Sequence, residues 1–211
     1  MGNVIIPKHT AELVYFDSAM KILSDAKDWI LMGDFTDNLF KHLKAIGKEQ
    51  TRHSDNTHYT KCAQLPLYFG FAERNVVSGK TYLRITFIGQ AFYDARKRGD
   101  FSSMHLLLLE SLEHGLFGEE NDGVPSSRSD VDAPNLFVRA SYDLEGLSNK
   151  EFAYILWSLV DKNGDYTGSV NQIRKFRKKG VWNLPSNATN YQDCKPIMIL
   201  NRWNFLTQGS T

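Results

Sequence analysis

Cysteines are scarce in this chain and long apolar runs are absent. Both features restrict the classes of protein to which the chain can belong. Only Cys62 and Cys194 are cysteines, and no second pair of ligands lies near either. This excludes a zinc-finger framework and predicts buried thiols in a reduced, cytoplasmic protein. No stretch approaches the roughly 18 apolar residues that a membrane span needs, and the first ten residues lack the apolar region of a signal peptide. We therefore expect a cytoplasmic protein with no membrane partner.

Catalytic motifs are missing as well. A cleavage centre of the restriction-nuclease kind needs a carboxylate followed by Glu-x-Lys or Asp-x-Lys on a strand, where carboxylates hold Mg²⁺ and the lysine assists the attacking water. No Glu-x-Lys occurs, and Asp25-Ala26-Lys27, preceded by Asp17, lies on a helical pattern. The pattern favours an exposed helix face. A complete nuclease centred on Asp17, Asp25 and Lys27 is the alternative, but we expect no catalytic residue here.

Metal and phosphate sites are also lacking. Asp161, Asn163 and Asp165 have the spacing of the first ligands in a calcium loop, but Tyr166 and Gln172 replace its obligatory glycine and glutamate. The six histidines have no metal-ligand spacing, and the chain has neither a glycine-rich phosphate loop nor a Gly-x-Ser-x-Gly motif. The sequence therefore predicts no metal and no cofactor in this chain.

Charge is plentiful but unevenly distributed. Lys and Arg outnumber Asp and Glu by 14 to 11 in residues 1–100 and by 8 to 3 in residues 161–211, whereas residues 101–160 hold 3 against 10. Two basic ends around an acidic middle suggest that the ends share a polyanionic partner, and that the middle faces away from it or contacts protein. Ordinary variation among solvated surfaces is the alternative.

One segment, Asn56–Arg98, has the order of a helix, a two-stranded hairpin and a second helix. Its first part carries an apolar helical stripe that ends at Gly70, the residue type that favours a left-handed helix end. Residues 71–77 and 81–87 are β-prone and are joined across Ser78-Gly79-Lys80, and a helix follows from Gly89. The stripe consists of Tyr59, Cys62, Leu65 and Phe69. This order is typical of a winged helix, a fold used above all to lay a helix in a DNA groove.

Helical patterns also flank this segment. One runs from Phe16 to Ile30, and a second begins at a capping Asp34 and ends at Gly47, with a buried stripe of Phe35, Leu39, Phe40, Leu43 and Ile46. Residues 101–116 form an amphipathic helix opened by Ser102 or Ser103, and an acidic polar loop extends to Pro134. Ser148 and Glu151 have capping-box spacing, and a basic helix spans residues 169–179.

Near the C-terminus the pattern of the first segment returns. Thr189, Tyr191 and Cys194 repeat the spacing of Thr57, Tyr59 and Cys62, and Trp203-Asn204-Phe205 resembles Phe69-Gly70-Phe71. Asn204 preserves the left-handed preference of Gly70. Each copy also has a proline, Pro66 or Pro196, that kinks its helix or marks its first turn. Coincidence is the alternative to a second winged helix.

These patterns predict a mainly α protein with small β-wings, an α+β fold containing two winged-helix-type DNA-binding units. We expect the first winged-helix unit in residues 1–100 and a connecting helix with an acidic loop in residues 101–147. Residues 148–211 would form the second unit, which is incomplete at its wing.

The residues predicted to contact DNA are polar or basic and lie on the two predicted reading helices, the wing and the basic helix. Short polar groups suit base edges, and cations suit phosphates. They are Asn56, Thr57, His58, Thr60, Lys61, Gln64, Arg74, Asn75, Lys80, Arg84, Arg174, Lys175, Arg177, Lys178, Lys179, Thr189, Asn190, Gln192 and Lys195.

The series of segments also resembles a known family. LRITFIGQAFYDA is similar to the wing and closing helix of many winged helices. LSNKEFAYILWSLVDK, SVNQIRKFRKK and NYQDCKPIMILNRWNFLT together resemble the N-terminal DNA-recognition region of AlwI-like type IIS restriction and nicking endonucleases. The resemblance covers residues 34–207 and implies a target recognition domain of a restriction-modification enzyme. It implies a partner nuclease domain or subunit that would bring its own Mg²⁺.

Two other functions use the same predicted fold. A winged-helix transcriptional regulator would bind a palindrome as a dimer. A protein-interaction module would use the acidic middle of the chain as a contact surface instead of DNA.

Overall fold

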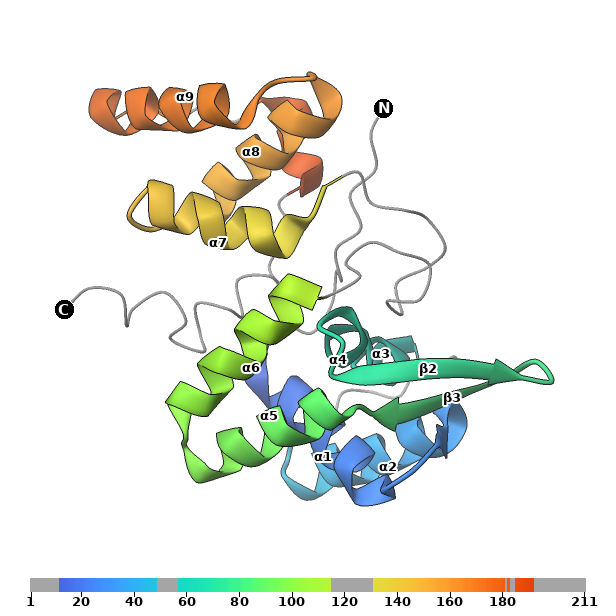
Figure 1. The fold of residues 1–211 in the computed structure, drawn as a ribbon. Coiled ribbons are helices and arrows are strands. Elements are labelled where there is room, and N and C mark those ends of the chain that lie inside the picture. Colours follow the sequence, from blue (N-terminus) through green and yellow to red (C-terminus); the bar gives the residue numbers. More distant parts are fainter. Residues whose placement is uncertain (1–11, 49–56, 115–130, 181, 183–184, 192–211) are drawn as a thin grey trace. The chain divides into compact units, whose positions relative to one another are not determined.

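The computed structural model describes residues 12–48, 57–114, 131–180, 182 and 185–191, and these residues are mainly helical (Figure 1). They include a small three-stranded antiparallel sheet, which makes the fold α+β. The chain divides into two compact units. His9–Pro125 forms the N-terminal unit, and residues from Ser126 onward belong to the C-terminal unit.

The N-terminal unit is built from six helices and three strands in its described part. In chain order they are α1 (Leu13–Ala26), β1 (Ile30–Leu31), α2 (Met32–Ala45), α3 (Thr57–Lys61), α4 (Gln64–Tyr68), β2 (Ala72–Val77), β3 (Lys80–Ile85), α5 (Phe87–Arg98) and α6 (Phe101–His114). The helix α6 packs on α5 and belongs to the same unit.

The sheet has the order β1–β3–β2, with both pairs antiparallel. Val77 pairs with Lys80, so a two-residue turn of Ser78 and Gly79 closes the hairpin. Both turn residues have positive φ, 50° and 73°, as a type I′ turn requires. The hairpin prediction is confirmed, with a turn one residue shorter than expected. The strand β1 was not predicted, because Ile30 fits the periodicity of the preceding helix equally well.

The predicted reading helix, Asn56–Phe69, is two short helices in its described part. The helix α3 ends at Lys61, and α4 begins at Gln64 after a turn. All four residues of the apolar stripe are buried, so the predicted inward face is correct. Pro66 lies in the first turn of α4, where its missing N–H costs no helical hydrogen bond. Four of the five residues of α4 are buried, which makes α4 a core helix.

The hairpin and α5 are joined tightly through Phe71. Thr86 caps α5 by accepting a hydrogen bond from the Gly89 N–H at 3.0 Å, and the Thr86 N–H donates to the Phe71 carbonyl. A Cβ on Gly89 would lie 1.9 Å from that same carbonyl oxygen, so only glycine fits. The rings of Phe71 and Phe92 stack with centroids 4.4 Å apart. The close approach at Gly89 thus places the start of α5 against the residue that precedes β2.

Three helix ends differ from the sequence predictions. Asp34 lies in the first turn of α2, whose N-cap is Leu31, and Ile46 is 46% exposed instead of completing the buried stripe. Asp100 rather than a serine caps α6, since its carboxylate accepts hydrogen bonds from the N–H and hydroxyl of Ser103. Each of these caps lies one or more residues outside the apolar pattern that locates a helix in a sequence.

The C-terminal unit contains α7 (Ala133–Asp143), α8 (Asn149–Asp161), α9 (Tyr166–Lys179) and the 3-10 helix η1 (Ser186–Tyr191). The prediction missed α7, whose start it assigned to the polar loop. Asp132 caps α7, and Pro134 occupies its first turn instead of closing a loop. The capping box of α8 is confirmed. Ser148 Oγ accepts from the Glu151 N–H at 3.3 Å, and the Glu151 carboxylate accepts from the Ser148 N–H at 2.8 Å.

Candidate nucleic-acid interface

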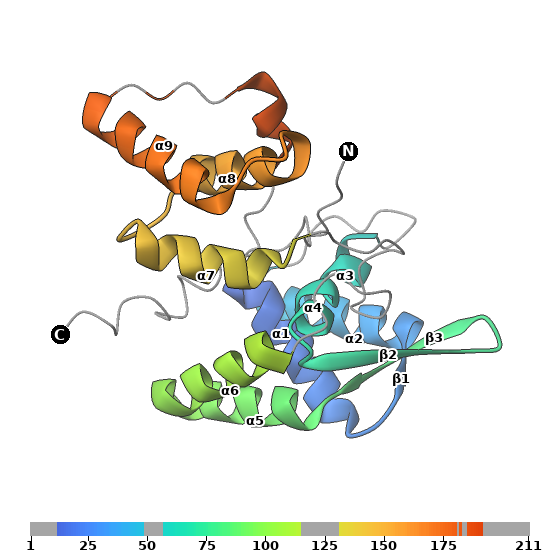
Figure 2. The same ribbon diagram turned by 45° about the horizontal axis from the view of Figure 1, so that its top comes forward.

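The β2–β3 hairpin projects beyond the helices of its own unit (Figures 1 and 2). Its outer half carries exposed polar and basic side chains. Arg74, Asn75 and Lys80 are all exposed. Opposed residues of an antiparallel pair share one face, so Arg74, which pairs with the buried Leu83, lies on the face toward the helical core. Asn75 and Lys80 lie on the other face. Each face of the hairpin therefore carries one basic side chain.

Arg84, also predicted to contact DNA, already contacts other residues of the protein at the base of the hairpin. Its guanidinium is 2.6 Å from a carboxylate oxygen of Glu73, directly opposite on β2, and 3.9 Å from Asp28. The same group lies 4.6 Å from the centroid of the Trp29 ring, a cation–π contact. Arg84 thus ties β2, β3 and the segment before β1 together.

The short helix α3 presents a smaller polar surface than the sequence predicts. Thr60 is exposed, whereas Lys61 and Gln64 are half-buried. His58 is half-buried as well, with its ring edge-on to Tyr15 at 5.1 Å between centroids. Asn56 and the side chain of Thr57 lie outside the described residues. Of this predicted reading helix, Thr60 with parts of Lys61 and Gln64 is the surface that the structure shows open to solvent.

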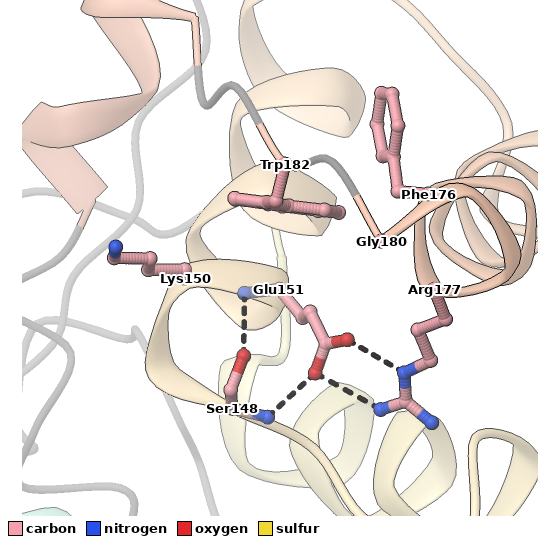
Figure 3. A pocket seen from close by; sticks show the side chains of 7 residues that line it. All are labelled: Ser148, Lys150, Glu151, Phe176, Arg177, Gly180 and Trp182. Carbon is pink, nitrogen blue, oxygen red and sulfur yellow. Dashed lines mark hydrogen bonds and ion pairs between the residues drawn. The ribbon is translucent and has the colours of Figure 1, made fainter.

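Arg177 on α9 binds within the protein (Figure 3). Its Nε donates to Glu151 Oε1 at 2.7 Å and its Nη2 to Glu151 Oε2 at 2.9 Å. Its two Nη groups also donate to the carbonyls of Leu144 and Gly146. Burial on its own raises the pKa of Glu151, but hydrogen bonds from Arg177 and Ser148 outweigh it and hold that pKa below its usual value. Arg177 thus fastens α9 to α8 and to the loop before it.

The remaining basic residues of α9 are more accessible. Lys175, Lys178 and Lys179 are exposed, and the structure gives them no acidic partner among the residues it describes. Arg174 is exposed too, but its Nη2 donates to the Asp143 carbonyl at 2.7 Å. The basic cluster predicted on this helix therefore separates into two anchoring arginines and three solvated lysines.

A cavity of about 300 Å³ lies beside the Glu151–Arg177 pair (Figure 3). Phe176 and Trp182 form aromatic walls, with ring centroids 4.7 Å apart, and Lys150 lies at its edge. The ion pair in the cavity wall is already engaged in internal hydrogen bonds. The ring faces and Lys150 are the lining groups that the structure shows outside this network.

The second predicted reading segment, Thr189–Lys195, is described only at its start. The backbone of Thr189 and Asn190 belongs to η1, while their side chains, and all of Gln192 and Lys195, lie outside the described residues. Tyr191 Oη donates to Asp161 Oδ1 at 3.1 Å, which holds η1 against α8. The predicted repeat at Cys194, Pro196 and residues 203–205 also lies outside the described part.

The alternative nuclease centre does not assemble. Asp17 accepts two hydrogen bonds from Arg96, and Asp25 pairs with Lys21 four residues away. Asp17 and Asp25 lie two turns apart on α1, about 12 Å along the axis. In the part of the chain that the structure describes, no group of three or more His, Cys, Asp or Glu side chains gathers. A second Asp-x-Lys, Asp193-Cys194-Lys195, lies outside that part.

Similarity to known proteins adds no family to these observations. No helix within the described ranges is long and apolar enough to span a bilayer. No protein-family model matches the chain, and neither a curated protein nor a solved structure is detectably similar to it.

Proposed function

We propose that this chain is a sequence-specific double-stranded DNA recognition module of the winged-helix type. The observation that carries the proposal is the arrangement of the N-terminal unit, in which helix, short strand, helix, helix pair and hairpin follow one another. The central strand of its sheet, β3, pairs with both β1 and β2. A winged helix has this order, and the β2–β3 hairpin would be its wing.

The distribution of charge supports DNA as the partner. Arg74 and Lys80 lie on opposite faces of the hairpin, where they reach two different phosphates without competing for one. The three solvated lysines of α9 supply a second set of backbone contacts. Arg84 and Arg177 are excluded from this set because their guanidinium groups already bind carboxylates. Phosphate contacts fix the position of the protein on DNA, while base edges give specificity.

The resemblance to AlwI-like enzymes extends the proposal to the parent activity. In that setting the chain positions a separate nuclease domain or subunit, and Mg²⁺ belongs to that partner. The pairing of Asp17 with Arg96 supports this division of labour, since it occupies the carboxylate that the alternative centre would need.

The experiment is fluorescence anisotropy of the full chain on labelled random and selected duplexes over a range of salt. We expect binding to duplex DNA whose log affinity falls linearly with log salt. Lys80→Gln should weaken binding to all sequences alike, whereas Lys41→Gln, an exposed lysine on α2, should not. Weak and salt-insensitive binding to every duplex would exclude the proposal.

A protein-interaction module remains a second candidate because of one observation. A groove of about 590 Å³ between α1, α2 and α5 is lined by the apolar side chains of Val14 and Ile46 and by Lys97. It also contains charged residues that are already paired, Asp17 with Arg96 and Lys21 with Asp25. Apolar walls with a lysine at the rim suit an acidic amphipathic peptide. Retention of such a peptide together with no retardation of DNA would favour this function, and Lys97→Glu should then abolish the retention.

A further inference from the structure

The helices α8 and α9 are joined by a four-residue turn whose shape is fixed on both sides. The turn spans residues 162–165, and Asn163 has a positive φ of 47°. The Gly164 N–H donates to the Ser158 carbonyl at 2.9 Å, and a Cβ on Gly164 would lie 2.4 Å from Ser158 Oγ. Asp165 then caps α9 through the Gly168 N–H at 2.6 Å. A short turn that contains a glycine is typical of helix-turn-helix motifs and of other helical hairpins.

The face that α9 turns toward α8 is well defined. Ser169, Val170 and Ile173 are buried, and Ser169 Oγ is 2.9 Å from Ser158 Oγ on α8. Arg177 completes this inward face through its bonds to Glu151. The side chains on the opposite face of α9 therefore point to solvent.

The outward face of α9 changes in character along the helix. Thr167 and Asn171 lie one turn apart in the first half, and both are exposed, as is Gly168 between them. Lys175 and Lys178 continue the same face in the second half. Arg174, held on the Asp143 carbonyl, lies with its Nη1 3.5 Å from Asn171 Oδ1. Short hydrogen-bonding groups thus precede cations on one stripe.

This order of side chains along α9 matches the way in which a recognition helix contacts DNA. The amide of asparagine pairs in two places with the N6 and N7 edge of adenine in the major groove. A recognition helix reads bases with its N-terminal residues. Lysines near a helix C-terminus also offset the helix dipole, so Thr167 and Asn171 carry the inference and the charge alone does not.

We propose that α8 and α9 form a helix-turn-helix and that α9 enters the major groove of duplex DNA. Asn171 and Thr167 would lie at base edges, with Lys175 and Lys178 at the flanking phosphates. Base reading in the C-terminal unit is thereby assigned to α9, in place of residues 189–195. The inference rests on the proposed DNA-recognition function and names the helix that supplies its specificity in this unit.

The test is selection of bound duplexes from a random pool by the full chain and by its Asn171→Ala variant. The wild-type chain should enrich a motif, and Asn171→Ala should bind that motif about tenfold more weakly and lose its preference at one adenine-containing base pair. Replacing that adenine by 7-deazaadenine removes the N7 acceptor. It should weaken the wild type but leave the variant unchanged, an outcome that a merely structural role would not produce.

One control variant and two outcomes of the selection complete the test. Asn38→Ala changes an exposed asparagine on α2 and should keep both motif and affinity. If the wild type enriches no motif, the proposed function fails and this inference fails with it. If the wild type enriches a motif that Asn171→Ala binds equally well, DNA recognition stands and the assignment to α9 is overturned.

Discussion

At the scale of single residues, basic side chains that bind a carboxylate of the protein must be distinguished from those that can contact DNA. The sequence suggests phosphate contacts for both Arg177, which lies in a run of basic residues, and Arg84, which lies on a strand of the predicted wing. In the structure each meets a carboxylate at hydrogen-bond distance, Glu73 for Arg84 and Glu151 for Arg177. Lys80 and the three exposed lysines of α9 show no such partner in the described ranges, and they are the better candidates for contact with DNA.

The ion pair of Glu151 gives a prediction for the pH dependence of stability. The pKa of Glu151 is lowered in the folded chain, so its contribution is present above the unfolded pKa and is lost as pH falls through the folded one. Glu151→Gln should lower the free energy of unfolding at pH 7 by about 1–2 kcal/mol, a figure kept small because Arg177 is partly exposed. Denaturant unfolding from pH 7 to pH 3 should show this difference shrinking. A difference that is constant with pH would contradict it.

At the scale of elements, the structure depends on a few close approaches that join one element to the next. Gly89 lets α5 start against the Phe71 carbonyl, and Gly164 lets α9 turn back onto α8. At Gly89 the contact is with backbone atoms, so a side chain there displaces the whole element, whereas at Gly164 the nearest atom is the side-chain oxygen of Ser158.

Gly89 has a matched control in Gly33, which makes the prediction sharp. A Cβ on Gly89 meets backbone at 1.9 Å, whereas a Cβ on Gly33, in the exposed first turn of α2, meets nothing within 4 Å. Gly89→Ala should destabilise the N-terminal unit by at least about 2 kcal/mol. Gly33→Ala should be neutral or stabilise by up to about 1 kcal/mol. Thermal unfolding followed by circular dichroism measures both, and equal effects would refute the argument.

Elements set by local sequence were predictable, and those set by distant contacts were not. The hairpin turn at Ser78-Gly79 and the capping box at Ser148 depend on residues within a few positions of each other. The strand β1 exists only because Ile30 pairs with Leu83, which is far away in the sequence. The partner of Arg177, Glu151, lies 26 residues away and could not be predicted for the same reason. Glu73 is different, because the register of the hairpin places it opposite Arg84 once the turn is fixed at Ser78-Gly79. The candidate residues were therefore predicted by type more successfully than by role.

At the scale of the whole molecule, the chain places basic surface in both of its units. If both grip one duplex, their phosphate contacts add in the salt dependence of binding. Replacing Lys175, Lys178 and Lys179 together by glutamine should reduce the slope of log affinity against log salt by about 3, and Lys80→Gln by about 1. Anisotropy titrations between low and moderate salt measure these slopes. Slopes that do not change would show that these lysines are solvated without touching DNA.

The stacking of Arg84 on Trp29 has a practical consequence. An indole in contact with a guanidinium has fluorescence that responds to the position of that group, and this indole lies where the hairpin joins its unit. Trp157 and Trp182 report on the other unit, through contacts with Tyr154. Keeping Trp29 and replacing the other tryptophans by phenylalanine would give the hairpin an intrinsic optical reporter. Its emission would then follow the arrival of a ligand at the hairpin without any attached dye.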